Sequence, residues 1–424
     1  MVKKDKRFLF ALLFIVLSAV AARLVVGLLY FNAFDTYWYR DWAIGLQDGF
    51  FNVYTRAEEI SLDYPPLYLY CLYLTGAAYR LFTIDCSPMM QMFLMKFWPI
   101  FFDGLCILLV YKISEKHGNW TALFAAASIA ANPSQFFGTA YWGQTDQLLI
   151  LLLLWSFSLS GERPLLSCII MAVAGLTKYQ ALFFTPVLLA FIFRTHGIKK
   201  LLYGIVSAAS TVVAVFLPFM LGARDPLLFF KVYLGGADTY QYCTFNAYNI
   251  YALLGLNGVE DSNPAIGIFT YSNVNLIIVF LIIAGTLLMY ALGRRVNVYI
   301  GGLLIMDAIF VFVTRMHERY LLVAVPFALM AYVTTKNRHF LYQFIGLTFT
   351  TLINQAAVLL RVNDGKVFFV PYINFIIDFI SICNVILFIY IAYVSINYFR
   401  GKECRYDLFK TKKRDFSQRK TANA

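Results

Sequence analysis

The sequence predicts an all-α protein that crosses a membrane many times. Hydrophobic residues make up 61% of its 424 residues and charged residues only 14%, and apolar runs near the length of a bilayer crossing recur along the chain. No soluble domain of useful size remains between or beside these runs. A basic start, Met1 to Arg7, leads into a long apolar run without a small-residue cleavage site, which favours a retained first helix over a cleaved signal peptide.

Thirteen apolar runs are candidate crossings. They are residues 8–28, 65–84, 91–112, 119–136, 146–160, 164–176, 179–194, 199–221, 271–293, 297–314, 318–334, 339–360 and 368–398. Lys and Arg beside membrane segments prefer the cytoplasm, and both ends of this chain are basic. Two cytoplasmic ends require an even number of crossings, so one run must lie along the surface.

The run 65–84 is the one predicted to stay outside the bilayer. Placing it on the outer surface brings the basic loops to the inside, at Lys112/Lys116, Arg194/Lys199/Lys200, Arg294/Arg295 and Lys336/Arg338. Its tyrosines suit the headgroup layer, so we expect a juxtamembrane helix in a first outer loop, residues 31–90. The result is a transmembrane domain over residues 1–399 with about 12 crossings, followed by a basic cytoplasmic tail at 400–424.

The run 164–194 is expected to form two short helices that meet at Lys178. Both Arg163 and Arg194 lie inside only if the chain goes out and returns between them. A break at membrane depth must line a hydrated or protein-filled cavity, and a charge there is a functional hypothesis by default. The alternative for Lys178 is a side chain that snorkels to the headgroups.

The polar segments on the predicted outer face are where we expect the function. Asp35 is the candidate general base, with Asp41 in reserve. Outer-face cations could hold a phosphate, with arginine binding it through two parallel hydrogen bonds; they are Arg40, Lys178, His317, Arg319 and Arg361. A carboxylate that activates an acceptor hydroxyl, opposite a phosphate leaving group held by cations, is sufficient for inverting glycosyl transfer.

Nothing in the sequence predicts a metal or a cofactor. The chain has neither a DxD pair nor a glycine-rich nucleotide loop, so a lipid monophosphate sugar is a better donor than a nucleotide sugar. No second histidine lies at ligand spacing from His317. The seven cysteines are scattered without a CxxC, which predicts no disulfide and no zinc site. The basic tail fits contact with anionic lipid, and no nucleic-acid partner is expected.

Several motifs, in order along the chain, carry a resemblance to a known family. They are Asp35 with Arg40 and Trp42, the DYPPL of residues 63–67, Lys96 with Asp103, Pro133 with the WGQTD of residues 142–146, Lys178 with Gln180, and His317 with Glu318 and Arg319. With these motifs the chain resembles the GT-C superfamily of membrane glycosyltransferases. It is similar to the endoplasmic-reticulum glucosyltransferases that extend lipid-linked oligosaccharide and to bacterial relatives of the GPI-anchor mannosyltransferases.

The resemblance implies roles for particular residues over about three quarters of the chain by order and spacing. It implies that Asp35 is the general base and that the region of His317 and Glu318 lies at the phosphate of a polyprenyl-phosphate sugar, without metal. The sequence departs from the reticulum enzymes at Tyr37, where they carry a second acid. It also departs at WGQTD, where they carry a histidine-rich turn and the bacterial members do not.

Most of these residues also have a structural interpretation. Asp35 could cap a helix or pair with Arg40, and Asp146 could be the N-cap of a helix that begins at Gln147 instead of a contact to sugar or phosphate. Trp142 and Gln144 could bind a sugar or simply anchor the interface.

The charged residues elsewhere are open to a similar choice. The cluster from His317 to Arg319 could be an interfacial set of salt bridges in which Arg315 competes. Lys96 and Asp103 lie two helical turns apart, so each is expected to have a different partner. Asp307 and Asp378 are expected to be buried acids with structural roles.

The sequence therefore predicts a GT-C-like hexosyltransferase, mannosyl- or glucosyl-like, in the cell membrane of a bacterium. Its expected base is Asp35, its donor phosphate site is Arg40, Lys178, His317 and Arg319, and its sugar or acceptor contacts are Trp42, Trp142, Gln144, Asp146 and Glu318. The donor would be a polyprenyl-phosphate monosaccharide and the acceptor an envelope glycan, lipid or polymer. The alternatives are a flippase or transporter of a lipid-linked sugar, which would also need central charges, and a non-catalytic membrane scaffold.

Overall fold

The structure is a computed structural model that describes residues 6–30, 33–81, 88–363, 366–367 and 372–402. It is mostly helical, with two small antiparallel hairpins. The helices of the first half are α1 (Lys6–Leu29), α2 (Ala33–Gly45), η1 (Leu46–Asp48), η2 (Val53–Arg56), α3 (Pro66–Leu81), α4 (Pro88–Ser114), η3 (Glu115–His117), α5 (Asn119–Ala130), α6 (Pro133–Phe136), η4 (Phe137–Trp142), α7 (Asp146–Leu159), α8 (Pro164–Gly175) and α9 (Ala181–Ala223). Those of the second half are α10 (Leu228–Asp238), α11 (Ile250–Leu253), α12 (Tyr271–Leu292), α13 (Val298–Phe312), η5 (Tyr320–Val323), α14 (Ala324–Thr335), α15 (Arg338–Arg361) and α16 (Ile373–Phe399). The hairpins are β1 (Pro264–Ile266) with β2 (Phe269–Thr270), and β3 (Val362–Asn363) with β4 (Lys366–Val367).

The apolar runs of the sequence form helices because a helix satisfies its own backbone groups in an apolar environment. Within the described residues six helices are long and apolar enough to cross a membrane, and four shorter helices of 10–17 residues are also apolar. The long α9 contains the predicted runs 179–194 and 199–221, separated by the non-helical backbone of Gly197 (φ 76°, ψ 177°). The chain is thus a helical protein with several candidate membrane spans.

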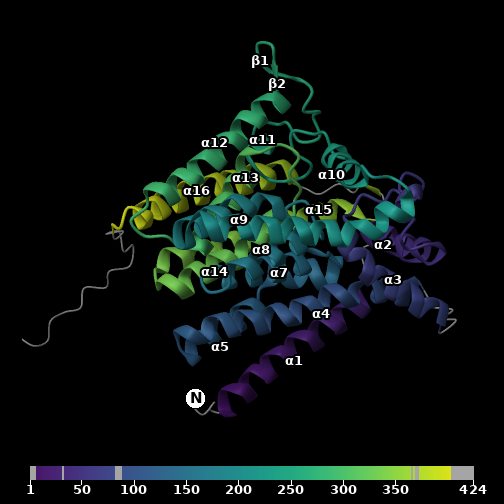
Figure 1. Ribbon diagram of the computed structural model, residues 1–424, viewed down its shortest axis with the longest axis horizontal. Helices are drawn as coiled ribbons and strands as arrows, with labels where there is room; N and C mark the ends of the chain where they lie inside the picture. The colour runs from purple at the N-terminus through teal and green to yellow at the C-terminus, as the bar shows by residue number, and fades with distance from the viewer. Residues whose placement is uncertain (1–5, 31–32, 82–87, 364–365, 368–371, 403–424) are drawn as a thin grey trace, which may run out of the picture.

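Different segments of the chain lie at the two ends of the helix bundle. The first residues of α1 and the last residues of α16 lie on the left of Figure 1, whereas α2, α3 and α10 lie on the right. The right-hand end is called the site end below. The predicted first outer loop is more ordered than expected, since α2, η1, η2 and α3 fold most of it into helix. α3 packs on α2, η1 and α4.

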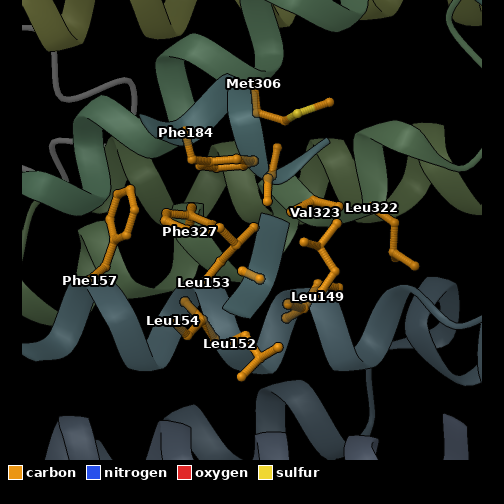
Figure 2. Close-up of a cluster of buried hydrophobic side chains, with 14 of the residues drawn as sticks. Leu149, Leu152, Leu153, Leu154, Phe157, Phe184, Met306, Leu322, Val323 and Phe327 are labelled. Atoms are coloured by element: carbon orange, nitrogen blue, oxygen red, sulfur yellow. The ribbon is translucent and has the colours of Figure 1, made fainter. Parts of the chain in front are cut away.

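A dense apolar core connects the middle of the bundle to the site end. Figure 2 shows leucines of α7 facing Leu322 and Val323 of η5, with Phe157, Phe184 and Phe327 beside them. All of these side chains are buried, and interiors packed this closely hold their elements in fixed register. Since Asp146 begins α7 and Arg319 directly precedes η5, this core fixes both charged residues at the site end.

The acids expected to be buried in the bundle behave differently from one another. Asp307 is fully buried on α13, whereas Asp378 is exposed on α16, so the prediction of burial is wrong for Asp378. Its helix presents an apolar surface outward, and Asp378 lies among those outward positions. Lys96 and Asp103 have different partners as predicted: Lys96 donates to the carbonyls of Tyr30 and Ala140, and Asp103 pairs with Arg23.

Candidate functional site

A cavity of about 690 Å³ opens at the site end, between the first loop and α10. Its wall combines acids, cations and aromatic rings from segments far apart in the sequence. Asp35 comes from α2, Asp63 from the segment before α3, Lys178 from the break between α8 and α9, and Arg319 from the turn before η5. A concave space with convergent polar groups is where a ligand site is expected.

Asp35 is held in place by two donors. Its Oδ2 atom accepts hydrogen bonds from Trp142 Nε1 at 2.7 Å and from Gln144 Nε2 at 2.6 Å. Its Oδ1 atom accepts none from the described residues. The structural alternative in which Asp35 pairs with Arg40 is not observed, since Arg40 pairs with Asp41. Trp142 and Gln144 orient the carboxylate rather than lining the cavity themselves.

The π-helix η4 ends with Trp142, and Gln144 lies two residues after it. η4 follows α6, which begins with Pro133 after an Asn132 side chain that accepts from the Ser134 and Gln135 amides. The C-cap of η4 is Gly143, which lies in the left-handed region (φ 80°). A Cβ at this position would lie 2.9 Å from Lys96 Cγ. Glycine is needed there both for the backbone conformation and for space, and single π-turns are frequent at functional sites.

Lys96 ties this turn to the start of the first loop. Its fully buried ammonium donates to Tyr30 O at 2.5 Å, just past the end of α1, and to Ala140 O at 3.0 Å, in η4. The two segments that lead to Asp35 and to its donors therefore share one anchor.

Arg40 does not join the predicted phosphate site. Its guanidinium donates to Asp41 Oδ1 at 2.9 and 2.7 Å and lies over the ring of Tyr37, and it is not part of the cavity wall. Arg361 at the end of α15 does not line the cavity either. Asp41, one residue away, competes for Arg40. The prediction that Arg40 and Arg361 lie at the phosphate site is therefore corrected, since neither lines the cavity.

Lys178 is buried and paired. Its Nζ lies 2.7 Å from Asp146 Oδ1, with side-chain exposures of 6% and 2%, so it does not snorkel. The predicted break is confirmed, because α8 ends at Gly175 and α9 begins at Ala181. Asp146 is not the N-cap of α7: that position is Thr145, which makes no side-chain capping hydrogen bond.

Arg319 forms the other half of the charged cluster. Its Nη1 donates to Glu318 Oε1 at 2.8 Å, and its Nε lies 3.9 Å from Asp146 Oδ2. Within the part of the chain that the structure describes, neither that Nε nor that Oδ2 has a hydrogen-bond partner, although both atoms are buried. Arg319 lies over the Trp142 ring, which places it close to the donors of Asp35. Glu318 is buried behind Arg319 and does not line the cavity.

His317 lies behind the cavity wall in a ring of aromatic side chains. Its imidazole packs against Tyr240, Phe245 and Tyr320. Burial lowers the pKa of His317 well below its ordinary value, and the charge of Arg319 lowers it further, so His317 is a neutral hydrogen-bonding group. The expected competitor Arg315 is engaged elsewhere, with Asp261 at 2.7 Å.

Two acids near the cations have raised affinities for protons. Burial raises the pKa of Glu318, although Arg319 partly opposes the shift. Burial likewise raises the pKa of Asp63, against the opposing influence of its own backbone amide and of Lys178. Glu318 and Asp63 thus tolerate a nearby anion better than ordinary carboxylates would.

Asp63 and several tyrosines of the wall were not assigned by the sequence reasoning. Asp63 opens the DYPPL motif and its carbonyl accepts a hydrogen bond from Tyr179. The motif was the available signal, but only the fold shows that its acid faces the cavity. The hydroxyl groups of Tyr39 and Tyr64 form a hydrogen bond of 3.0 Å.

Trp42 completes this aromatic wall. It donates Nε1 to Ile60 O at 2.8 Å and lines the cavity beside the two tyrosines. Of the predicted sugar contacts, Trp42 is therefore the one on the surface of the cavity.

No group of three or more His, Cys, Asp and Glu side chains placed to hold a metal occurs in the part of the chain that the structure describes. No family model matches the sequence, and no curated protein matches it either. The case for a function therefore depends on the geometry of the cavity.

Proposed function

We propose that the protein is an inverting, metal-independent glycosyltransferase of the GT-C type that uses a polyprenyl-phosphate monosaccharide donor. The observation that carries the proposal is the placement of Asp35. Its carboxylate is fixed through one oxygen by Trp142 and Gln144, and it lines the same cavity as Lys178 and Arg319.

The reaction is a single displacement at the anomeric carbon. Asp35 accepts the proton of the acceptor hydroxyl through its open Oδ1 atom, and the hydroxyl oxygen forms the new bond as the bond to the phosphate oxygen breaks. The polyprenyl phosphate leaves with the electron pair, and Arg319 and Lys178 stabilise its negative charge. Trp42 and the tyrosines offer ring faces to the sugar.

The proposal includes a topology with twelve crossings, a surface position for α3 and both termini in the cytoplasm. Its support is that α1 starts and α16 finishes at the end of the molecule opposite the cavity (Figure 1). The donor lipid would reach the cavity near the break at Lys178, and the acceptor, an envelope glycan, lipid or polymer, would arrive from the aqueous side. We propose the bacterial cell membrane as the location.

The test uses purified protein in proteoliposomes with polyprenyl-phosphate mannose or glucose, radiolabelled in the sugar, and envelope extract as acceptor. Asp35→Asn should abolish transfer and retain donor binding. The matched control is Asp41→Asn, because Asp41 is exposed and pairs with Arg40; it should retain transfer. Near-normal turnover by Asp35→Asn would refute the assignment.

The same vesicles separate the transferase from a flippase. A transferase releases polyprenyl phosphate and passes the label to the acceptor, whereas a flippase moves the labelled lipid intact to the other leaflet. Label recovered wholly as intact donor in the opposite leaflet would overturn the proposed reaction.

A further inference from the structure

One face of α15 is polar although it is buried in the bundle. Gln343, Thr350, Thr351, Asn354 and Gln355 are each at most 1% exposed. Thr350 and Thr351 follow Gln343 by seven and eight residues, and Asn354 and Gln355 follow these two by four residues each. This spacing puts all five residues on one side of the helix. Gln343 and Gln355 are separated by twelve residues, which corresponds to about 18 Å along the helix axis.

Several buried amides around this face have no hydrogen-bond partner among the described residues. Both amide atoms of Gln135, Gln147 and Gln355 are unpartnered, and so are Gln343 Oε1 and Thr351 Oγ1. A buried polar group without a hydrogen bond is costly. A set of such groups in one region is typical of a space that holds ordered water.

These amides extend from the interior to the candidate site. α15 packs against α6, which carries Gln135. A Cβ at Gly138 of η4 would lie 3.8 Å from Gln355 Nε2. Gln147 directly follows Asp146 at the start of α7, and Asp146 Oδ2 is itself unpartnered. The unsatisfied groups therefore connect the charged cluster at the site end with the middle of α15.

Asp307 lies at the other end of this series. It is fully buried on α13, and its Oδ2 accepts from Gln343 Nε2 at 2.9 Å while its Oδ1 has no partner. No Lys, Arg, His, Asp or Glu of the described residues forms a hydrogen bond or ion pair with it.

Asp103 provides the contrast. It is equally buried but pairs with the guanidinium of Arg23. A buried carboxylate without a cation is far costlier than a neutral acid, so Asp307 should carry a proton where Asp103 does not. The neutral acid then needs an acceptor for its O–H, such as water.

We infer that Asp307 is a proton-binding site inside the bundle, reached from the cavity by water held between the unpartnered glutamines. Polar and ionisable groups of this kind mark ion pathways and proton relays in membrane proteins. The inference is independent of glycosyl transfer, because none of these groups takes part in the proposed displacement.

Infrared difference spectroscopy of the detergent-purified full chain tests the inference directly. Subtracting the spectrum of Asp307→Asn from wild type at neutral pH should leave a protonated carboxylic acid C=O band. The band should move to lower wavenumber soon after transfer into heavy water. Asp103→Asn is the matched control and should remove no such band, because the ion pair with Arg23 should keep Asp103 ionised. If Asp307→Asn fails to fold, Asp307→Glu should shift the band.

A second variant tests the route of the water. Gln355→Leu should slow the isotope shift of the Asp307 band at least several-fold, since it removes an unpartnered buried amide beside η4 that is inferred to hold the water. Absence of the carboxylic acid band in wild type would overturn the proton site. An isotope shift that takes as long as global hydrogen exchange, or that is unaffected by Gln355→Leu, would overturn the water route.

Discussion

Breaking the buried Asp146–Lys178 pair should destabilise the protein strongly. The two charged atoms lie 2.7 Å apart at exposures of 2% and 6%, and removing one partner of such a pair typically costs about 3–5 kcal/mol. Arg319 Nε, 3.9 Å from the second oxygen of Asp146, compensates in part when Lys178 is removed. We therefore expect about 3 kcal/mol for Lys178→Met.

A double-mutant cycle measures this coupling. The variant Asp146→Asn with Lys178→Met leaves no uncompensated charge, so it should recover most of the lost free energy of unfolding. The assay is equilibrium unfolding in mixed detergent micelles. The control pair is Lys112 and Glu115, at a similar 2.8 Å but with Lys112 68% exposed, where coupling should stay below about 1 kcal/mol.

The result that would refute the reasoning is additivity. If the two substitutions at 146 and 178 add within about 0.5 kcal/mol, the pair is not energetically coupled. Activity separates stability from function: the double variant should be folded but inactive, because it lacks the cation proposed to hold the donor phosphate.

The other predictions concern single positions. Trp142→Phe keeps a ring but removes the 2.7 Å hydrogen bond to Asp35, so kcat should fall about 10- to 100-fold with little change in KM; an unchanged kcat would contradict it. Lys96→Met removes the lysine donor from the Tyr30 and Ala140 carbonyls, and both the unfolding midpoint and the turnover should fall; wild-type values for both would exclude the anchoring role. Gly76→Ala places a Cβ 2.0 Å from a backbone oxygen of α2, which should cost about 1–3 kcal/mol of unfolding free energy; a wild-type unfolding curve would show that α3 shifts freely. Burial lowers the pKa of His317, so it stays neutral at the neutral pH where an ordinary histidine begins to titrate, and the rate profile of His317→Gln should keep the wild-type shape; a limb of the wild-type profile that His317→Gln removes would show that His317 titrates.

The helices were predictable because their signal is local. Each of the thirteen apolar runs overlaps helix in the described residues, and the interruption around Lys178 and the separation of two runs at Gly197 both follow from polar or glycine positions. α2 was not predicted as a helix. Its mixture of aromatic and acidic residues has no clear period, and its stability comes from packing against α3 and α4.

The composition of the cavity was predictable only in part, since the position of a residue in the sequence does not show which way its side chain points. Asp35, Lys178, Arg319 and Trp42 line it as expected, but Arg40 turns to its neighbour Asp41. Trp142 and Gln144 belong to the site through Asp35 rather than through direct exposure to the cavity. The hydrogen bonds from Trp142 and Gln144 to Asp35 join residues 107 and 109 positions apart, so local spacing cannot reveal them. The resemblance to a family gave the order of the motifs along the chain but not their arrangement in space.

Asp146 shows that an ion pair with a residue far away in the sequence can outweigh the local preference for helix capping. An aspartate at the start of a helix is typically worth about 1 kcal/mol as a cap, which made capping a reasonable expectation. The carboxylate is only 2% exposed beside Lys178, and leaving that buried ammonium unpaired would cost about 3–5 kcal/mol. The stronger interaction decides the rotamer: Asp146 turns toward Lys178, thirty-two residues away, and the first turn of α7 is left without a side-chain cap. The same comparison explains why removing Lys178 should harm the fold as well as the proposed chemistry.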